Sequence, residues 1–432
     1  MSAVDENTYV LVGSELSYFA AKIRAYLQWK GIPFVQALAS QRVYAEVIRP
    51  LTRTNFIPIL ILPRSQARSV PKAIQDTRGM IRYLEEHHRD LKHSVIPVSS
   101  SALAFTAAWV ELLADQWLNI QGRFWMGQKD VLDQQREWIM TELGDTILGG
   151  KKATMAAKMG ADQQGWTNFP LVLPNLGITD TTAPAIRQQF LHTLALLSTH
   201  LAYHRFLLGD RISLADFAVY APFYAHLSRN PVPGFILKTQ APLVFEWIER
   251  VGGMGRAGSA HGGVVTLDEK GEWVNEYASV PEDTELPETL VPLLELWLGD
   301  YLPLLAESCE QVSRFLEGGK GKPFEARKGW VELPRAVGWQ AFELRSGTEG
   351  LVARGKRAVI PHAVWMLQEL VKEVYDGREA DGDGVIRRVA GGGMTEGPWR
   401  RCVEWVRNGK WRLERVENRL VAGPRIEGGT KL

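Results

Sequence analysis

The first ninety residues alternate short apolar runs with helical stripes. Residues 9–12 form a β-rich run that ends at Gly13, and Phe19, Ile23, Tyr26 and Leu27 then recur at helical spacing. Further extended runs begin at Phe34 and at Ile57, and a second amphipathic helix opens at Asp76. This order of strands and helices predicts a small α/β domain over residues 1–92.

Beyond residue 99 the apolar spacing becomes helical. Two stripes carry the signal, and their members are Leu103, Ala107, Val110 and Leu113, and then Phe190, Leu194, Leu197 and Leu201. Ser213 and Asp216 have the spacing of a capping box, in which the serine caps the helix start and the acidic residue reaches back to the serine amide. The pattern predicts an all-helical domain over residues 100–254.

The remaining residues divide into a linker, an extension and a tail. Glycines crowd residues 252–263, so we expect a linker over 255–279. Residues 280–376 combine a long helix, short strands and another helix, which predicts an α+β extension. The tail, 377–432, is rich in basic residues, and we expect its aromatic run at 399–411 to be a solvated surface strand.

Composition narrows the function classes. Fifty Lys and Arg against 49 Asp and Glu give a net charge of +1, which argues against a dedicated nucleic-acid binder. The two cysteines, Cys309 and Cys402, exclude a disulfide scaffold and a cysteine-rich zinc fold. No metal motif stands out, and no apolar run has the roughly 18–20 residues of a membrane span. We expect a cytoplasmic protein.

Several stretches together resemble the glutathione transferase superfamily. They are GSELSYFAAKIR at 13–24, KGIPF at 30–34, NFIPIL at 55–60, QDTRGMIRYLE at 75–85 and FLLGDRISLADF at 206–217. The resemblance implies a thioredoxin-like N-terminal domain, an all-α C-terminal domain and, after them, the α+β extension. It also implies glutathione as substrate or cofactor and a homodimer.

Ser17 is the first candidate for catalysis. In the family a Ser, Cys or Tyr near this point hydrogen-bonds the glutathione sulfur and favours the thiolate, which is the reactive species. The start of a helix suits an anion because its amide groups and positive dipole end point there. Ser14 and Tyr18 are alternates, and Ser17 can equally be a plain helix cap.

Ile57 and Pro58 are candidates for glutathione binding. The resemblance implies a cis bond before Pro58 and a main-chain pairing of Ile57 with the cysteinyl part of glutathione. The alternative is an edge-strand proline without a ligand. Asn55 and Phe56 stand where the family often has Gly-Lys, which removes a cation for the glycyl carboxylate.

Asp76 and Thr77 match the acidic and hydroxyl pair of the family. The Thr77 hydroxyl and the helix start suit the γ-glutamyl carboxylate, and Asp76 suits the γ-glutamyl ammonium group. Ordinary capping would select the same residues.

Two further sets are open. Trp109, Trp117, Trp125 and Trp138 lie where the family builds its apolar substrate pocket, and each could equally be core. The extension is similar to a C-terminal module of some bacterial glutathione-transferase-like proteins. Its best polar candidates are Arg335, Arg357 and His362, which surface salt bridges would also explain.

Two functions follow. The first is an enzyme that activates glutathione as a thiolate and adds it to an apolar electrophile, or uses it in isomerisation or elimination. The second is a non-catalytic glutathione-transferase-like binding or scaffold protein. Ser17, Pro58 and Asp76-Thr77 favour the enzyme, whereas Tyr18 and Asn55-Phe56 depart from the family pattern and favour the scaffold.

Overall fold

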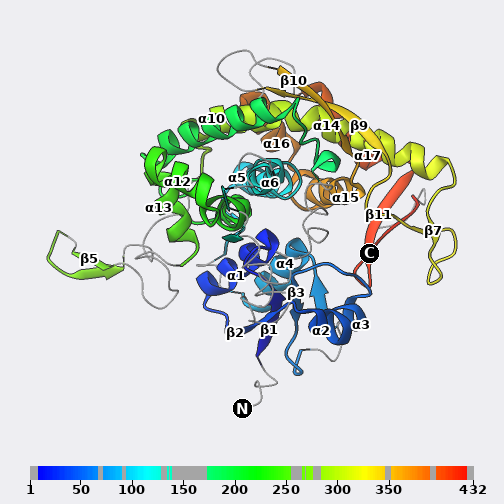
Figure 1. Cartoon of the computed structure of the whole chain (residues 1–432), viewed down its shortest axis with the longest axis horizontal. Coiled ribbons are helices and arrows are strands. Elements are labelled where there is room, and N and C mark those ends of the chain that lie inside the picture. The colour runs from blue at the N-terminus through cyan, green and yellow to red at the C-terminus, as the bar shows by residue number, and fades with distance from the viewer. Residues whose placement is uncertain are drawn as a thin grey trace.

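The chain forms an α/β domain, a helical domain and an α+β extension that packs against both (Figure 1). This arrangement confirms the predicted fold class. The computed structural model describes residues 8–66, 72–89, 94–127, 134–135, 137–138, 173–253, 265–267, 269–275, 284–345, 352–389 and 396–425.

The N-terminal domain is built on a four-stranded sheet in the order β2-β1-β3-β4. Strand β1 runs parallel to β2 and antiparallel to β3, and β3 runs antiparallel to β4. The elements are β1 Tyr9–Gly13, α1 Tyr18–Lys30, β2 Phe34–Leu38, α2 Gln41–Val43, η1 Tyr44–Ile48, α3 Arg49–Thr52, β3 Ile59–Ile61, β4 Ala73–Gln75 and α4 Thr77–His87.

The predicted capping box is present in the helical domain. Ser213 and Asp216 cap α11 reciprocally, and Asp216 also accepts hydrogen bonds from Leu207 N (2.9 Å) and Trp247 Nε1 (3.0 Å). The elements are α5 Ser101–Leu113, η3 Ala114–Leu118, α6 Asn119–Gly127, η5 Pro174–Leu176, α10 Ala183–Leu201, α11 Leu214–Pro222, η6 Phe223–Ser228, α12 Pro231–Gln240 and α13 Pro242–Val251. Most of the linker region lies outside the described residues, apart from the short strands β5 Val265–Leu267 and β6 Trp273–Asn275.

The described residues of the predicted extension and tail fold together around one long helix, α14, and both are called the extension from here on. Its elements are η7 Glu288–Leu290, α14 Val291–Glu317, β7 Lys322–Pro323, β8 Val331–Glu332, β9 Trp339–Arg345, β10 Val352–Ala358, α15 Pro361–Leu370, η8 Val371–Tyr375, α16 Glu379–Val389, α17 Glu396–Asn408, β11 Trp411–Val416 and β12 Arg419–Pro424. The last hairpin joins a sheet in the order β11-β12-β8-β7, so the end of the described chain pairs with the middle of the extension.

The expectation of a solvated surface strand at 399–411 is wrong. Most of that run is helix α17, and Trp399 is only 2% exposed. Trp399, Cys402, Val403 and Val406 are all buried and recur at i, i+3, i+4 and i+7, which is the spacing of one helical face. That face packs toward α14.

One buried apolar cluster joins all three parts. It includes Ile23 of α1, Phe105 of α5 and Leu367 of α15. Helix α14 lies within it, and the stretch Glu288–Glu317 is long and apolar enough to cross a membrane. However, 61% of its most apolar window is buried inside the protein, as expected for a core helix.

Candidate functional site

The three stretches that hold Ser17, Pro58 and Asp76 meet at one end of the strands of the N-terminal sheet. Val12 pairs with Ile59, and Ile59 pairs with Gln75. Because both pairs are antiparallel, the register brings Gly13, Pro58 and Asp76 side by side: Gly13 follows Val12, Pro58 precedes Ile59, and Asp76 follows Gln75. A Cβ added to Gly13 would lie 2.7 Å from the Ala20 Cβ and 3.9 Å from the Pro58 Cβ. The first turn of α1 and Pro58 thus lie against the end of β1.

Ser17 is the N-cap of α1. Its hydroxyl oxygen accepts a hydrogen bond of 3.3 Å from Ala20 N, and the side chain is half-buried. The capping role is therefore real, but a hydroxyl that accepts still has its own O–H to donate. Ser17 also lies at the positive end of the helix, where an anion is stabilised.

The two alternates are more deeply buried than Ser17. The Tyr18 hydroxyl donates to the Asp115 carbonyl oxygen (2.8 Å), and burial raises the pKa of Tyr18 well above its usual value. Ser14 is buried, and its carbonyl accepts from Ser17 N (3.2 Å). The geometry therefore leaves Ser17 as the hydroxyl best placed at the helix start.

The peptide bond between Ile57 and Pro58 is cis, as predicted. Among the described residues, no partner hydrogen-bonds to the main chain of Ile57, which is half-buried. Phe56 is 45% exposed, and the Arg335 guanidinium lies 5.1 Å from the centre of its ring. Arg335 belongs to the segment between β8 and β9, so the extension reaches this stretch.

Both carboxylate oxygens of Asp76 have partners. Its Oδ1 atom caps α4 by accepting from Arg78 N (3.0 Å) and Gly79 N (3.4 Å). Its Oδ2 atom lies 2.6 Å from His362 Nε2 and 3.7 Å from an Arg415 nitrogen, both from the extension. Asp76 therefore caps α4, and it also makes a charged contact, but its partners in that contact are residues of the same chain.

The turn between β11 and β12 completes this contact. Glu417 and Asn418 both have positive φ, as in a two-residue hairpin turn. The Asn418 Oδ1 atom accepts from Gln75 N (3.1 Å), and Arg415 Nη2 donates to Gln75 Oε1 (2.8 Å). In Figure 1 the red hairpin descends to the N-terminal domain beside α2 and α3.

The neighbouring charged groups determine the pKa of Asp76. Burial alone would raise the pKa of Asp76, but His362, Arg415 and Lys22 together hold it well below its usual range. Behind it lies a second ion cluster, in which buried Glu111 accepts from Lys22 (3.0 Å), Arg78 (2.7 Å) and Arg82 (2.7 Å). These cations lower the pKa of Glu111 despite its burial.

The extension also contributes a side chain, Glu373, to this ion cluster. Glu373 accepts from Arg78 (2.5 Å) and lies 3.4 Å from Arg82. Thr77, at the start of the same helix α4, is buried. The contact therefore involves α1, α4, α5 and the extension at once.

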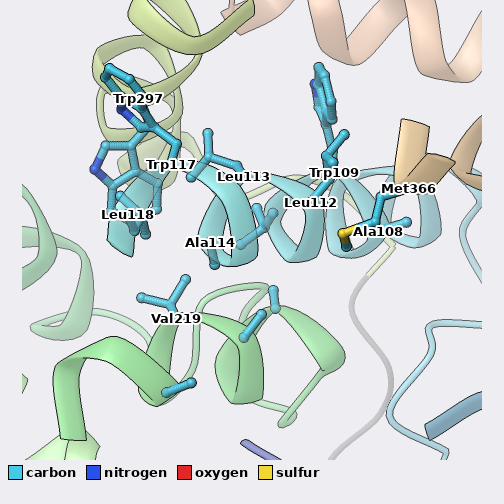
Figure 2. Packing of buried hydrophobic residues seen from close by; sticks show 14 of the residues in the cluster. Ala108, Trp109, Leu112, Leu113, Ala114, Trp117, Leu118, Val219, Trp297 and Met366 are labelled. Atoms are coloured by element: carbon cyan, nitrogen blue, oxygen red, sulfur yellow. The ribbon is translucent and has the colours of Figure 1, made fainter. Parts of the chain in front are cut away.

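Three of the four tryptophans predicted for a substrate pocket are core residues. Trp109 packs on Trp399 with ring centres 5.4 Å apart, Trp117 on Tyr301 at 5.9 Å, and Trp125 on Phe190 at 5.3 Å. Figure 2 shows Trp109 and Trp117 pointing from the α5 region toward the extension. The fourth, Trp138, is half-buried beneath the Arg229 guanidinium at 5.5 Å.

Of the three polar candidates in the extension, two lie at the site and one lies in the core. His362 and Arg335 reach the site, whereas Arg357 is buried over the Trp117 ring (5.3 Å) and donates to the Gln116 carbonyl (3.1 Å). Sequence reasoning missed Arg415 and Asn418. The signal was a hairpin turn at Glu417-Asn418, since asparagine tolerates positive φ between two strands. Among the described residues, no cluster of three or more His, Cys, Asp or Glu is arranged for a metal.

Two known domain families match the chain, one in the N-terminal domain and one in the helical domain. Residues 11–92 match the glutathione S-transferase N-terminal domain, and residues 180–250 match the glutathione S-transferase C-terminal domain. None of the curated proteins matches the chain.

Solved structures give only a distant likeness. A glutathione S-transferase from Rhodospirillum rubrum F11 is 15% identical, with a TM-score of 0.37, over 63% of this chain and 99% of that one. A β-etherase from Sphingobium sp. strain SYK-6 is 15% identical, with a TM-score of 0.38, over 56% and 94%. A glutathione S-transferase from Methylobacillus flagellatus KT with glutathione bound is 18% identical, with a TM-score of 0.33, over 58% and 96%.

These scores are too low to bear on activity, so the assignment rests on the two domain matches together with the fold. Both matches lie in the predicted order, on the domains that the structure forms. The chain belongs to the glutathione transferase superfamily, with an α+β extension after its two family domains.

Proposed function

We propose that the chain is a glutathione-transferase-like enzyme that holds a thiol as its thiolate at the start of α1. The observation that carries this proposal is the position of Ser17 at the N-terminus of α1, whose first turn lies with the cis Pro58 against Gly13. The main chain of Ile57 has no hydrogen-bond partner among the described residues. The thiol would lie along Ile57 with its sulfur accepting the Ser17 O–H.

The chemistry needs little else. The thiol releases its proton to solvent, and the thiolate forms a C–S bond with the electrophilic carbon. The leaving group departs with its electron pair, or in an addition the neighbouring carbon takes a proton from solvent. A hydrogen bond that stabilises the thiolate is therefore the main contribution of the protein. Glutathione is the thiol that the family suggests, and an apolar small molecule is the second substrate.

A specific observation favours the second candidate function, a non-catalytic binding or scaffold protein. Asp76, which would bind the γ-glutamyl ammonium group, is already paired with His362 at 2.6 Å. In that case the extension would carry the function, and glutathione would not bind.

Calorimetric titration with glutathione, followed by conjugation to a generic aromatic electrophile, separates the two candidates. Ser17→Ala should lower kcat/KM by about 10–100-fold, because a hydrogen bond to a charged group is worth about 1.5–3 kcal/mol. Ser40→Ala is the matched control, since Ser40 caps α2 in the same domain by accepting from Val43 N. An unchanged rate in Ser17→Ala would remove Ser17 from catalysis, and no heat with millimolar glutathione favours the scaffold.

We also propose a cytoplasmic homodimer. The two free cysteines, Cys309 and Cys402, fit a reducing compartment. Helix α5 is buried against α15 and α16, and α4 is tied to the extension through Glu373. A dimer would therefore use surfaces other than these two helical faces.

A further inference from the structure

We propose that His362 and Arg415 determine the specificity of this site, by selecting a thiol whose far end carries a carboxylate but no ammonium group. This inference rests on the proposed function, because it assumes that a thiol lies between Ser17 and Asp76. It concerns only the end of the ligand that would face Asp76.

His362 presents a hydrogen-bond donor to Asp76 even when neutral. Gln116 Nε2 lies 3.1 Å from His362 Nδ1, and an amide nitrogen can only donate, so Nδ1 accepts. The ring proton is therefore on Nε2, which donates to Asp76 Oδ2 at 2.6 Å. With Oδ1 occupied by the α4 amides, neither Asp76 oxygen is left to an incoming ammonium group without competition.

Arg415 adds a charge to this arrangement. Its guanidinium is 3.7 Å from Asp76 Oδ2 and is held in place by the Gln75 side chain (2.8 Å) and the Asn418 carbonyl (2.9 Å). The same group lies 5.6 Å from the Trp365 ring centre. An ammonium group approaching Asp76 would meet this fixed positive charge, whereas a carboxylate would be attracted to it and to the start of α4.

These contacts belong to a fixed part of the fold. His362 is on α15, whose Val364, Met366 and Leu367 are buried in the common core. The hairpin is locked to the same helix, because the Gln368 side chain donates to the Leu413 carbonyl (2.7 Å) and accepts from Leu413 N (3.1 Å). Lifting the extension off Asp76 would break both sets of contacts, so we infer selection of the ligand rather than a movable lid.

The test compares glutathione with its deaminated analogue, glutaryl-cysteinyl-glycine, which differs only by the ammonium group. Calorimetry is done on the full-length chain and on His362→Phe, Arg415→Met and the double variant. Phenylalanine keeps the ring contact with Trp365, and methionine keeps an apolar stem. Arg412→Met is the matched control, since Arg412 lies on the same strand and pairs with Glu414.

In the unmodified protein the deaminated peptide should bind about tenfold more tightly than glutathione, and this preference should disappear in the double variant. Each single variant should lose part of the preference, and Arg412→Met should keep it. Binding of glutathione to the double variant alone would also support the inference. If glutathione binds the unmodified protein as tightly as the analogue or more tightly, the inference is wrong while the proposed function stands. No binding of either peptide to any variant would overturn both.

Discussion

Asp76 and Asp300 are both carboxylates at contacts between the extension and the family domains, yet their pKa values are shifted in opposite directions. Asp76 faces the His362 ring and the Arg415 guanidinium, which hold its pKa well below the usual range against the effect of burial. Asp300 is on α14 and accepts from the neutral Gln189 side chain (2.7 Å) and Arg345 N (3.2 Å), while its nearest guanidinium, that of the partly exposed Arg345, lies 3.8 Å away. Burial raises the pKa of Asp300 to about 7.

This difference in pKa shows that the extension makes one kind of contact with the N-terminal domain and another kind with the helical domain. At the N-terminal domain the extension supplies cations and donors to acidic groups at the edge of the candidate site. At the helical domain it supplies apolar side chains, and its buried Asp300 accepts from the neutral Gln189 side chain of that domain. The first contact can decide which ligand is accepted, whereas the second holds the extension in place.

The largest effect is expected at the ion cluster behind Asp76. Glu111→Ala leaves Lys22, Arg78 and Arg82 without their shared buried carboxylate, which should lower the free energy of unfolding by about 3–5 kcal/mol. Denaturant unfolding measures this loss. Glu46→Ala is the control, because Glu46 makes an exposed i,i+4 pair with Arg42 and should cost about 0.5 kcal/mol. Similar losses in both variants would contradict the buried cluster.

Asp300→Asn should change how stability depends on pH. Since the folded pKa lies above the ordinary value, the folded state binds the proton more strongly, and the Asp300 contribution to stability falls as pH rises from about 4 to about 7. The slope is at most about 1.4 kcal/mol per pH unit. The unfolding free energy of the variant should therefore gain on that of the unmodified protein across this window and level off above it. A difference that stays constant from pH 4 to 8 would contradict this account of Asp300.

Asn418→Gly tests the hairpin contact without disturbing its turn. Glycine accepts the positive φ of Asn418 but removes the acceptor for Gln75 N, so stability should fall by about 1 kcal/mol. Asn418→Asp keeps an acceptor at the same point beside Arg415 and should lose less. Thermal unfolding compares the two, and equal stability of the glycine variant and the unmodified protein would mean that the contact contributes nothing.

The smallest effect is expected at the rim. Glu417 pairs with Arg53 at 3.0 Å, but both side chains are more than half exposed. Glu417→Gln should change the unfolding free energy by about 0.5 kcal/mol or less. A larger loss, measured by the same denaturant unfolding, would mean that the hairpin turn is held by charge at its exposed rim as well as at Asp76.

The local pattern predicted the parts of the fold that local physics determines. The apolar stripe around Ile23, the capping box at Ser213 and the helix after Asp76 all follow from short-range spacing and capping chemistry. The site residues at one end of the sheet strands could be proposed because the family resemblance supplies their order. Their catalytic and binding roles stay predictions.

The contacts at Asp76 could not be predicted, because they join residues far apart in the chain. His362 is 286 positions after Asp76, and Asn418 is 343 positions after Gln75. The expectation for residues 399–411 was wrong for a similar reason: the arginines indicated a surface, while the buried Trp399 packs on α5, whose position the sequence does not specify. Trp109 is a core residue through this contact with Trp399, and Trp117 through its packing on Tyr301 of α14.

The most direct measurement is the pKa of a thiol bound to the protein, followed through the ultraviolet absorbance of the thiolate. With Ser17 donating at the start of α1, the bound thiol should ionise well below the value of about 8.5 for a free cysteine thiol, and Ser17→Ala should move it back toward that value. A bound thiol that titrates like the free one, or a lowered pKa that Ser17→Ala leaves unchanged, would contradict the assignment of Ser17.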